Sequence, residues 1–441
     1  MSDPLPPDRL ETRFHDKGPL YSEAQARAEA DRCLYCSDAP CVKACPTEIN
    51  IPEFIRKIGS GNLRGSARTI FEQNLLGWSC ARVCPVEVLC VGSCVYNGFD
   101  QEPIAIGRLQ RYATERAGFD ATRPVLARKA PTGRKVACVG AGPAGLAFAG
   151  YMALEGHEAV VYERAPLPGG LNTTGVAPYK IRADEALREV EAVLGLGAIE
   201  VKTGAGVGPD GVRGEDLLSQ YDAVFIGVGL GPDTRLGVPG EAGPGVVGAI
   251  TWIESLKLAP PSEVPARVLV IGGGNTALDV ARECAGLGVK QVAMAYRRDE
   301  SAMSGYAHEL AGARKEGVVL LENATPVEFL RDGGGGLVAV KLARTGPDGR
   351  PLFDQYFEHA CDLVVLAIGQ SKLREIAAEF PGVEVDKRGC VVVDGETRRT
   401  GNAKVFAGGD CINGGKEVVN AVADGRDAAR WLTAQWQKEG A

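Results

Sequence analysis

The 441-residue sequence has no run of the roughly 20 apolar residues that a helix needs to cross a bilayer. Its polar, proline-bearing amino terminus lacks the charged-then-apolar order of a secretory signal. Basic residues are not in excess either, because 49 Lys and Arg stand against 56 Asp and Glu, for a net charge of −7. We therefore expect a cytoplasmic protein that binds neither membrane nor nucleic acid.

Aromatic residues are also scarce, at 6%, whereas glycine is abundant, at 58 residues. Such a composition is common where backbone turns approach phosphate groups closely. The length predicts about three domains. In a reducing cytoplasm, the 13 cysteines indicate metal or redox chemistry before disulfides.

Eight of the cysteines fall between Cys33 and Cys94. One run reads Cys-x2-Cys-x4-Cys-x3-Cys-Pro from residue 33, the other reads Cys-Pro-x4-Cys-x3-Cys from residue 84, and Cys80 lies just ahead of the second. This spacing predicts two iron-sulfur sites, and the x3-Cys-Pro ending predicts that Cys45 serves a different cluster from the three cysteines before it. Two structural zinc ribbons are the alternative, since four thiolates suit either metal.

The cysteine region is expected to form a small helical domain over residues 1–125. Ser22 and Gln25 have the spacing of a capping box, and further helices are predicted near residues 52–58, 64–74 and 104–116. From a strand at 135–139 onward, strands and helices alternate, which is typical of a parallel sheet with both faces covered. The predicted fold class is therefore α/β, with a helical iron-sulfur domain at the amino terminus.

The first dinucleotide fingerprint follows the strand at 135–139. Gly140, Gly142 and Gly145 occupy the G-x-G-x-x-G positions, a helix follows, and the next strand ends in Glu163, where an acid meets a ribose hydroxyl. Gly142 lets the backbone approach a pyrophosphate at the amino terminus of that helix. This arrangement predicts a nucleotide site, which we assign to FAD.

A second fingerprint places Gly272, Gly274 and Ala277 in the same frame. Its second strand ends in Arg297 and Arg298, which suit a 2′-phosphate. We therefore expect NAD(P)H here, with NADPH favoured over NADH.

A flavin-binding fingerprint followed by a nicotinamide-binding one is the order typical of a hydride-to-flavin reductase. Asp410 follows a late strand, and the predicted helix after it, at 417–432, would direct its amino-terminal dipole at the flavin. The FAD domain is thus predicted to be split, over residues 131–235 and 372–441. The NAD(P) domain, residues 236–371, is inserted into it and carries two hairpin turns, at RDGGGG and TGPDGR.

Longer stretches carry a family resemblance. CLYCSDAPCVKACPTEINIPEFI and WSCARVCPVEVLCVGSCVYNGFDQEPIAIGRLQRYATE, followed by GAGPAG, ERAPLPGGL and AGGDCINGG, resemble the amino-terminal part of dihydropyrimidine dehydrogenase. In that family an FMN barrel, on the same chain or on a second subunit, reduces uracil and thymine. The chain resembles the separate electron-input subunit of the bacterial enzyme. The β subunit of glutamate synthase shares the layout.

The resemblance implies specific ligands. It assigns one [4Fe-4S] cluster to Cys33, Cys36, Cys41 and Cys94 and a second to Cys45, Cys84, Cys90 and the amide oxygen of Gln110, with Cys80 as a non-ligand. It adds Gly170, Leu171, Lys180 and Asp410 to the flavin site and Asn275 and Thr276 to the NAD(P) site. Lys180 stands where the family usually has arginine, and Ser304 where the mammalian enzyme has a basic residue.

The expected function is an NAD(P)H-oxidising subunit that passes electrons through FAD and two [4Fe-4S] clusters to an FMN-containing partner, which reduces pyrimidines. The expected assembly is a hetero-oligomer, and no protein base is required, because the cofactors perform the chemistry. One alternative is a glutamate synthase-type NADPH reductase subunit. The other is a zinc-stabilised nucleotide-binding scaffold that is not an enzyme.

Overall fold

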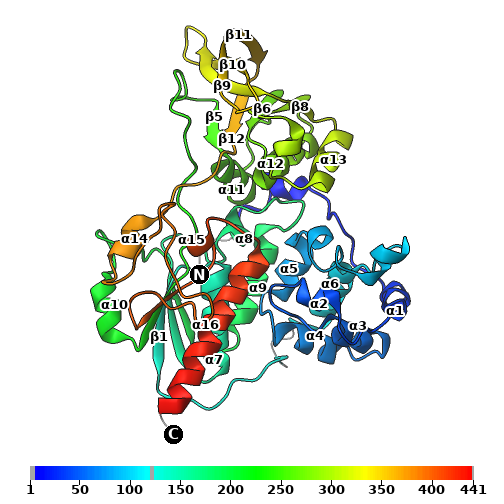
Figure 1. Cartoon of the computed structure of the whole chain (residues 1–441), viewed down its shortest axis with the longest axis vertical. Helices are drawn as coiled ribbons and strands as arrows, with labels where there is room; N and C mark the ends of the chain where they lie inside the picture. Colours follow the sequence, from blue (N-terminus) through cyan, green and yellow to red (C-terminus); the bar gives the residue numbers. More distant parts are fainter. Residues whose placement is uncertain (1–4, 120–123, 440–441) are drawn as a thin grey trace.

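The structure is a computed structural model that describes residues 5–119 and 124–439. Figure 1 shows a helical region, coloured blue, beside a central sheet domain, with a second sheet domain above both. This arrangement confirms the predicted α/β class with a helical amino-terminal domain. No helix in the described ranges has the length and apolarity that a membrane span requires.

The helical region is built from short helices packed around an aliphatic core. Its longer helices are α1 (Glu23–Asp31), α3 (Ile51–Gly59), α4 (Leu63–Phe71) and α6 (Ile106–Ala117), joined by α2 (Pro40–Lys43), α5 (Gly77–Val83) and the turns η2 (Val86–Val88) and η3 (Val95–Phe99). The turn η1 (Leu10–Arg13) instead packs against the second sheet domain, where Leu10 is part of the core. The predicted capping box is present, because Ser22 accepts from the backbone of Gln25 and Gln25 in turn accepts from Ser22. Apolar residues of α3 and α6 pack together with the cysteines.

The first sheet is entirely parallel, with the order β13-β4-β1-β2-β3. Its strands are β1 (Lys135–Val139), β2 (Glu158–Tyr162), β3 (Ile199–Lys202), β4 (Ala223–Ile226) and β13 (Val405–Ala407). Helix α7 (Pro143–Leu154) is apolar on every side and therefore buried, between the sheet and α16 (Val418–Glu439). Helix α9 (Ala183–Leu194) and the shorter helices α8 (Leu171–Thr174), α10 (Gly214–Gln220), α14 (Arg374–Ala378) and α15 (Asp410–Asn413) complete this domain.

The second sheet is also parallel, with the order β5-β12-β6-β7-β8. Its strands are β5 (Val246–Gly248), β6 (Arg267–Ile271), β7 (Gln291–Ala295), β8 (Val319–Leu321) and β12 (Leu363–Leu366), and its helices are α11 (Ala249–Leu258), α12 (Asn275–Gly286) and α13 (Ala307–Lys315), with the turn η4 (Glu300–Ala302). Strands β9 (Ala324–Arg331), β10 (Leu337–Thr345) and β11 (Pro351–Ala360) form an antiparallel sheet whose two connections fall at the predicted hairpin turns.

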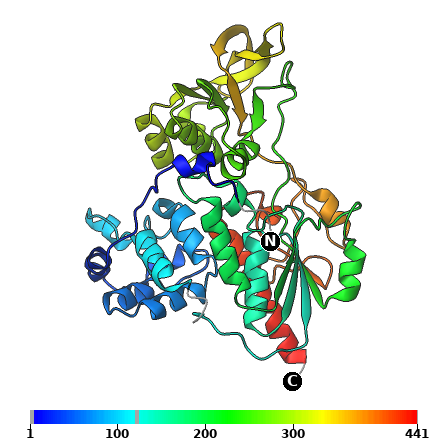
Figure 2. The same cartoon turned by 180° about the vertical axis from the view of Figure 1, so that it is seen from behind.

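Two segments connect the sheet domains and run side by side. The chain leaves the first sheet after β4 and returns to it only at β13, so the second sheet is formed within this excursion. Asp233 and Gln370 form an antiparallel bridge, and Gly231 donates its backbone N–H to Ser371 at 2.9 Å. The domain limits expected at 235/236 and 371/372 lie in these paired segments. Figure 2 shows η1 lying between the second sheet domain and the rest of the chain.

Candidate cluster and dinucleotide sites

Four cysteines line one cavity in the helical region. Cys33, Cys36, Cys41 and Cys94 contribute to its wall, and the remaining wall is largely apolar, from α3, η3 and the start of α6. Burial, reinforced by the neighbouring thiols of Cys33 and Cys94, raises the pKa of Cys41 to about 11. A cation is therefore needed to hold Cys41 as a thiolate. The donor set and its apolar surroundings fit a buried iron-sulfur cluster.

A second group of cysteines lies close to the first. Burial raises the pKa of Cys90 to about 12, with a further contribution from the nearby thiol of Cys45. The pKa of Cys84 is raised by a hydrogen bond with Cys80, by burial, and by Cys90 and Cys45. The structure thus brings Cys45, Cys84 and Cys90 together. Within the described residues, no three His, Cys, Asp or Glu side chains converge closely enough to hold a single metal ion.

Gln110, the fourth ligand implied by the resemblance, lies on the buried face of α6. Its side-chain nitrogen donates to the carbonyl oxygen of Gly77 at 2.6 Å, at the start of α5, the helix that precedes Cys84. This hydrogen bond fixes the amide nitrogen on α5 and leaves the oxygen as the end available to a metal. The first residue of α5 thus orients this side chain.

The first fingerprint adopts the turn that its glycines predict. Gly140 has φ of +101°, and a Cβ at this position would lie 2.6 Å from the carbonyl oxygen of Gly227, so only glycine fits. Beside Gly142 the space is open, with only Gly170 within 4 Å of an added Cβ. Gly145 lies in the first turn of α7. The open side of this turn, at the amino terminus of α7, suits a pyrophosphate.

The acids predicted for the flavin site lie at two strand ends of the first sheet. Glu163 follows β2 and accepts hydrogen bonds from the backbone of Ala141 and Ala165, both at 2.8 Å. Asp410 begins α15, which follows β13 after two glycines, and accepts from the backbone of Lys416 at 3.0 Å. Burial raises the pKa of Asp410. Leu171, after Gly170, begins α8 beside the same turn.

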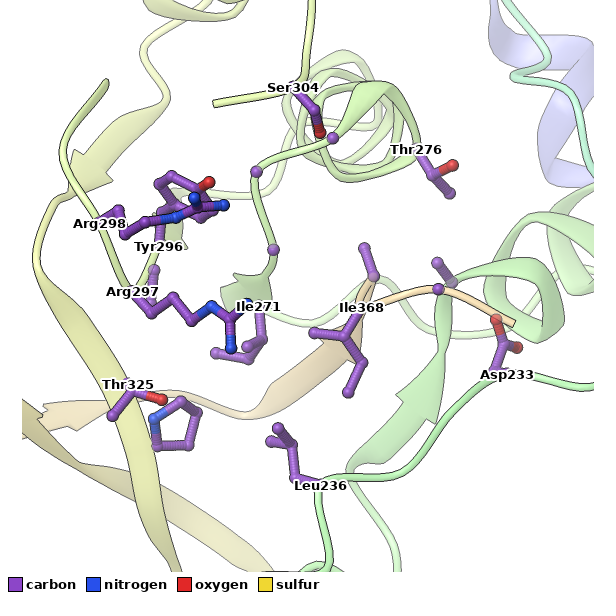
Figure 3. A pocket seen from close by; sticks show the side chains of 18 of the residues that line it. Asp233, Leu236, Ile271, Thr276, Tyr296, Arg297, Arg298, Ser304, Thr325 and Ile368 are labelled. Carbon is purple, nitrogen blue, oxygen red and sulfur yellow. The ribbon is translucent and has the colours of Figure 1, made fainter. Parts of the chain in front are cut away.

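A cavity of about 590 Å³ opens above the second fingerprint, within the range typical of ligand sites. Of the predicted residues, Gly272, Gly274, Thr276, Arg297 and Arg298 line it, as Figure 3 shows for Thr276 and both arginines. Asn275 lies at the start of α12, outside the cavity wall, and accepts a hydrogen bond from the backbone of Tyr306 at 2.9 Å.

The two arginines present their charge to this cavity in different ways. Arg298 lies over the ring of Tyr296, with its guanidinium carbon 5.5 Å from the ring centre. Its Nε is buried and has no hydrogen-bond partner within the described chain. Arg297 extends into the cavity on the side of Ile271 (Figure 3). A buried donor without a partner beside a second cation fits an anionic group, such as a nucleotide phosphate.

Several cavity residues were not predicted from the motifs. Tyr296 directly precedes the arginines, and its ring fills the space that a Cβ on Gly273 would need, at 2.5 Å. Because it follows the second strand of the fingerprint, Tyr296 could have been predicted from the sequence as a cavity residue. Thr325, Asp233 and Gln370 also line the cavity, but they come from β9 and the connecting segments, where no local pattern marks them.

Lys180 is held between the two sheet domains. Its ammonium lies 2.7 Å from Asp279 on α12 and 3.3 Å from Glu309 on α13. Tyr179 donates to the same Asp279 oxygen at 2.6 Å. The structure thus places Lys180 in an interdomain ion pair.

Known protein families match both parts of this architecture. Residues 10–120 match the family described as dihydropyrimidine dehydrogenase domain II, 4Fe-4S cluster, and residues 134–425 match the pyridine nucleotide-disulphide oxidoreductases. The chain therefore belongs to the pyridine nucleotide-disulphide oxidoreductase family and carries a 4Fe-4S domain in front of a flavin- and NAD(P)-binding domain. This membership confirms the predicted kinds of cofactor and argues against the zinc-stabilised scaffold.

Two kinds of curated relative align over most of their length. The small chain of glutamate synthase [NADPH] from Escherichia coli K12 is 37% identical over 439 residues, covering 93% of this chain and 92% of the relative. The NAD-dependent dihydropyrimidine dehydrogenase subunit PreT of the same strain is 33% identical over 415 residues, covering 93% and 94%. Both families named from the sequence are thus among the relatives.

Among solved structures, the thioredoxin reductase of T. acidophilum has a similar fold. It superposes with a TM-score of 0.56 at 22% sequence identity, covering 69% of this chain and 99% of that one. At this identity the likeness concerns the fold, namely the two dinucleotide-binding sheets.

Proposed function

We propose that the chain is an electron-input subunit that oxidises NAD(P)H and delivers single electrons to a partner protein. The observation that carries this proposal is the presence, in one chain, of a dinucleotide cavity with two arginines, a glycine turn for a second nucleotide, and a cavity lined by four cysteines. When bound, a flavin joins two-electron hydride chemistry to the one-electron chemistry of iron-sulfur clusters.

The chain's own residues bind and orient these groups. Arg297 and Arg298 are proposed to bind the 2′-phosphate of NADPH, while Thr276 and Asn275 mark the helix end beside the pyrophosphate. Glu163 fixes the turn of the first fingerprint and offers its carboxylate to a ribose. The domain limits are proposed as 1–125 for the cluster domain, 131–235 with 372–441 for the FAD domain, and 236–371 for the NAD(P) domain.

The two clusters are proposed to use the ligand sets named above. Cys33, Cys36, Cys41 and Cys94 hold the first, whose cavity they share. Cys45, Cys84, Cys90 and Gln110 hold the second. About eight irons and one FAD per chain are then expected.

For the partner, we propose an FMN-containing subunit that reduces uracil or thymine. The supporting observations are the match of residues 10–120 to the dihydropyrimidine dehydrogenase cluster domain and the buried Gln110 in the implied ligand position. The alignment with PreT over 94% of its length adds to them.

A second candidate partner is the large, glutamate-forming subunit of a glutamate synthase. Two observations favour it: the small chain from Escherichia coli has the higher identity, and its name specifies NADPH, whereas PreT is named as NAD-dependent. A nucleotide cavity with two arginines agrees better with NADPH.

A reconstitution experiment tests these proposals. The chain, purified without oxygen, is assayed for iron, flavin and dye reduction by NADPH and NADH, and then with each candidate partner. NAD(P)H oxidation that depends on uracil supports the pyrimidine partner, and glutamate formation supports the other. A purified chain that lacks both iron and flavin contradicts the electron-input function as a whole.

A further inference from the structure

A buried arginine of the FAD domain reaches the loop of the second cluster. Arg426 lies on α16 and is only 4% exposed. Its guanidinium donates to the carbonyl oxygen of Thr47, two residues after Cys45, and to that of Gln73 at 3.2 Å. Asp427, which is one-third exposed, accepts from Nε of Arg426 at 2.8 Å and lies equally close to its Nη2. The positive charge is thus directed at the Cys-Pro-Thr loop.

Thr47 connects this arginine to the cluster ligand. Its hydroxyl oxygen lies 3.3 Å from the sulfur of Cys45 and 3.4 Å from the amide nitrogen of Asn74, and both Thr47 and Asn74 are completely buried. An amide nitrogen can only donate, so the Thr47 oxygen accepts from Asn74. A sulfur bound to iron is a thiolate without a proton, so the Thr47 hydroxyl must donate to Cys45.

Each of these interactions favours an extra electron on the cluster that Cys45 serves. Reduction adds one negative charge, which is stabilised by a hydrogen bond to the ligand sulfur and by a buried cation nearby. Helix α16, which supplies the cation, begins eight residues after Asp410, and its first residues, Val418 and Val419, pack in the core of the cluster domain. One helix therefore runs from the proposed flavin loop to the cluster loop.

We propose that Arg426 and Thr47 are positioning residues that raise the reduction potential of the cluster held by Cys45. The inference rests on the proposed function, because it takes Cys45 as a ligand of the second cluster. The pair selectively tunes the cluster whose loop α16 contacts and leaves the cluster of Cys33, Cys36, Cys41 and Cys94 unchanged.

The test is a potentiometric titration of the whole holoprotein with dithionite, in which each cluster takes up one electron and is followed by electron paramagnetic resonance. The signal lost in Cys84→Ser identifies the second cluster. Thr47→Val replaces the hydroxyl by a methyl group of similar size, and Arg426→Met removes the charge while keeping an unbranched apolar side chain. Arg430→Met is the matched control, because Arg430 lies one turn later and also contacts Gln73, but is exposed and does not reach Thr47.

We expect Thr47→Val and Arg426→Met each to shift the midpoint potential of the second cluster downward, with iron content and the first cluster's potential unchanged, and Arg430→Met to have no effect. An unshifted second cluster in Thr47→Val at full iron content overturns the inference, as do equal shifts of both clusters. Thr47→Val keeps the test decisive should Arg426→Met not fold. If the proposed function itself is wrong, the result is distinguishable, because the unmodified protein then holds no clusters to titrate.

Discussion

The ammonium group of Lys180, in the first sheet domain, lies 2.7 Å from the carboxylate of Asp279 on α12 of the second sheet domain. Glu309 shares the same ammonium at 3.3 Å and is itself paired with Arg282. Arg282 in turn stacks over Tyr179, 4.9 Å from its ring centre. The domain interface is therefore held by alternating charges that are largely shielded from water.

Glu309 makes this interface sensitive to acid. Burial by itself raises its pKa, but the charges of Lys180, Lys17 and Arg282 outweigh that effect and lower the pKa to about 2. A carboxyl whose folded pKa is depressed stabilises the fold above its unfolded pKa and loses that contribution as the pH falls toward the folded value. We expect Glu309→Gln to cost about 3 kcal/mol near neutral pH, because it leaves buried cations unpaired.

The loss of unfolding free energy in Glu309→Gln should become smaller as the pH falls below about 4.5, because the unmodified carboxyl then begins to lose its own stabilising contribution. Urea unfolding of both proteins over a pH series measures it. Glu316→Gln is the control, since Glu316 pairs with the same Arg282 from a side chain that is 38% exposed. A deficit that is independent of pH would show that the Glu309 charge is not what holds the domains.

For Glu189 we expect stability to depend on pH in the opposite direction. This fully buried carboxylate of α9 accepts from the backbone of Trp78 at 2.9 Å and of Ser79 at 3.1 Å and so caps α5, the helix that precedes Cys84. Burial raises its pKa to about 7, and the hydrogen bonds from Ser79 and Trp78 only partly oppose this. A raised folded pKa means that stability present below the unfolded value is lost as the pH rises through about 7.

Glu189→Gln keeps an acceptor for both backbone groups and cannot ionise, so its stability relative to the unmodified protein should increase between about pH 5 and pH 8. Thermal unfolding across that range checks the difference. Glu189→Ala serves as the comparison, because it removes the cap and should cost about 1 kcal/mol or more at every pH. If the stability difference between Glu189→Gln and the unmodified protein does not change with pH, then Glu189 does not titrate in that range.

The nucleotide preference should depend on the two cavity arginines. A guanidinium pairs bidentately with a 2′-phosphate, whereas NADH offers only hydroxyls. Replacing Arg297 and Arg298 by Ala should raise the KM for NADPH roughly 10- to 100-fold, from the loss of charge-assisted hydrogen bonds, and hardly change that for NADH. Steady-state dye reduction with both nucleotides measures this, with Arg388→Ala, a 70% exposed arginine outside the cavity, as control. If the unmodified protein already prefers NADH, the two arginines do not serve to select NADPH.

Gln110 should matter for electron delivery more than for flavin reduction. Gln110→Leu removes the amide oxygen proposed as a ligand and also the hydrogen bond to Gly77. We expect partner-dependent activity to fall roughly 10- to 100-fold, as for other changes in the surroundings of a metal, while dye reduction persists, because dyes accept directly from flavin. The exposed Gln437→Leu is the control. Equal loss of both activities would place the defect in folding or in the flavin site.

Local sequence determined the parts of this protein that depend on neighbouring residues. The capping box at Ser22, the turn at Gly140 and the hairpins after β9 and β10 follow from backbone preferences of a few consecutive residues. The alternation of strands and helices likewise fixed the two parallel sheets, and cysteine spacing predicted the cluster domain that the family match confirms.

Tertiary structure decided the contacts between residues far apart in the chain. Arg426 reaches Thr47 across 379 positions, Glu189 caps a helix 110 residues away, and Lys180 pairs with Asp279 from another domain. No local pattern marks these residues, because their partners are chosen by how the domains pack. Once packing has excluded water, a buried charge or amide must find its partner within the protein, and only the folded chain determines which partner lies within reach.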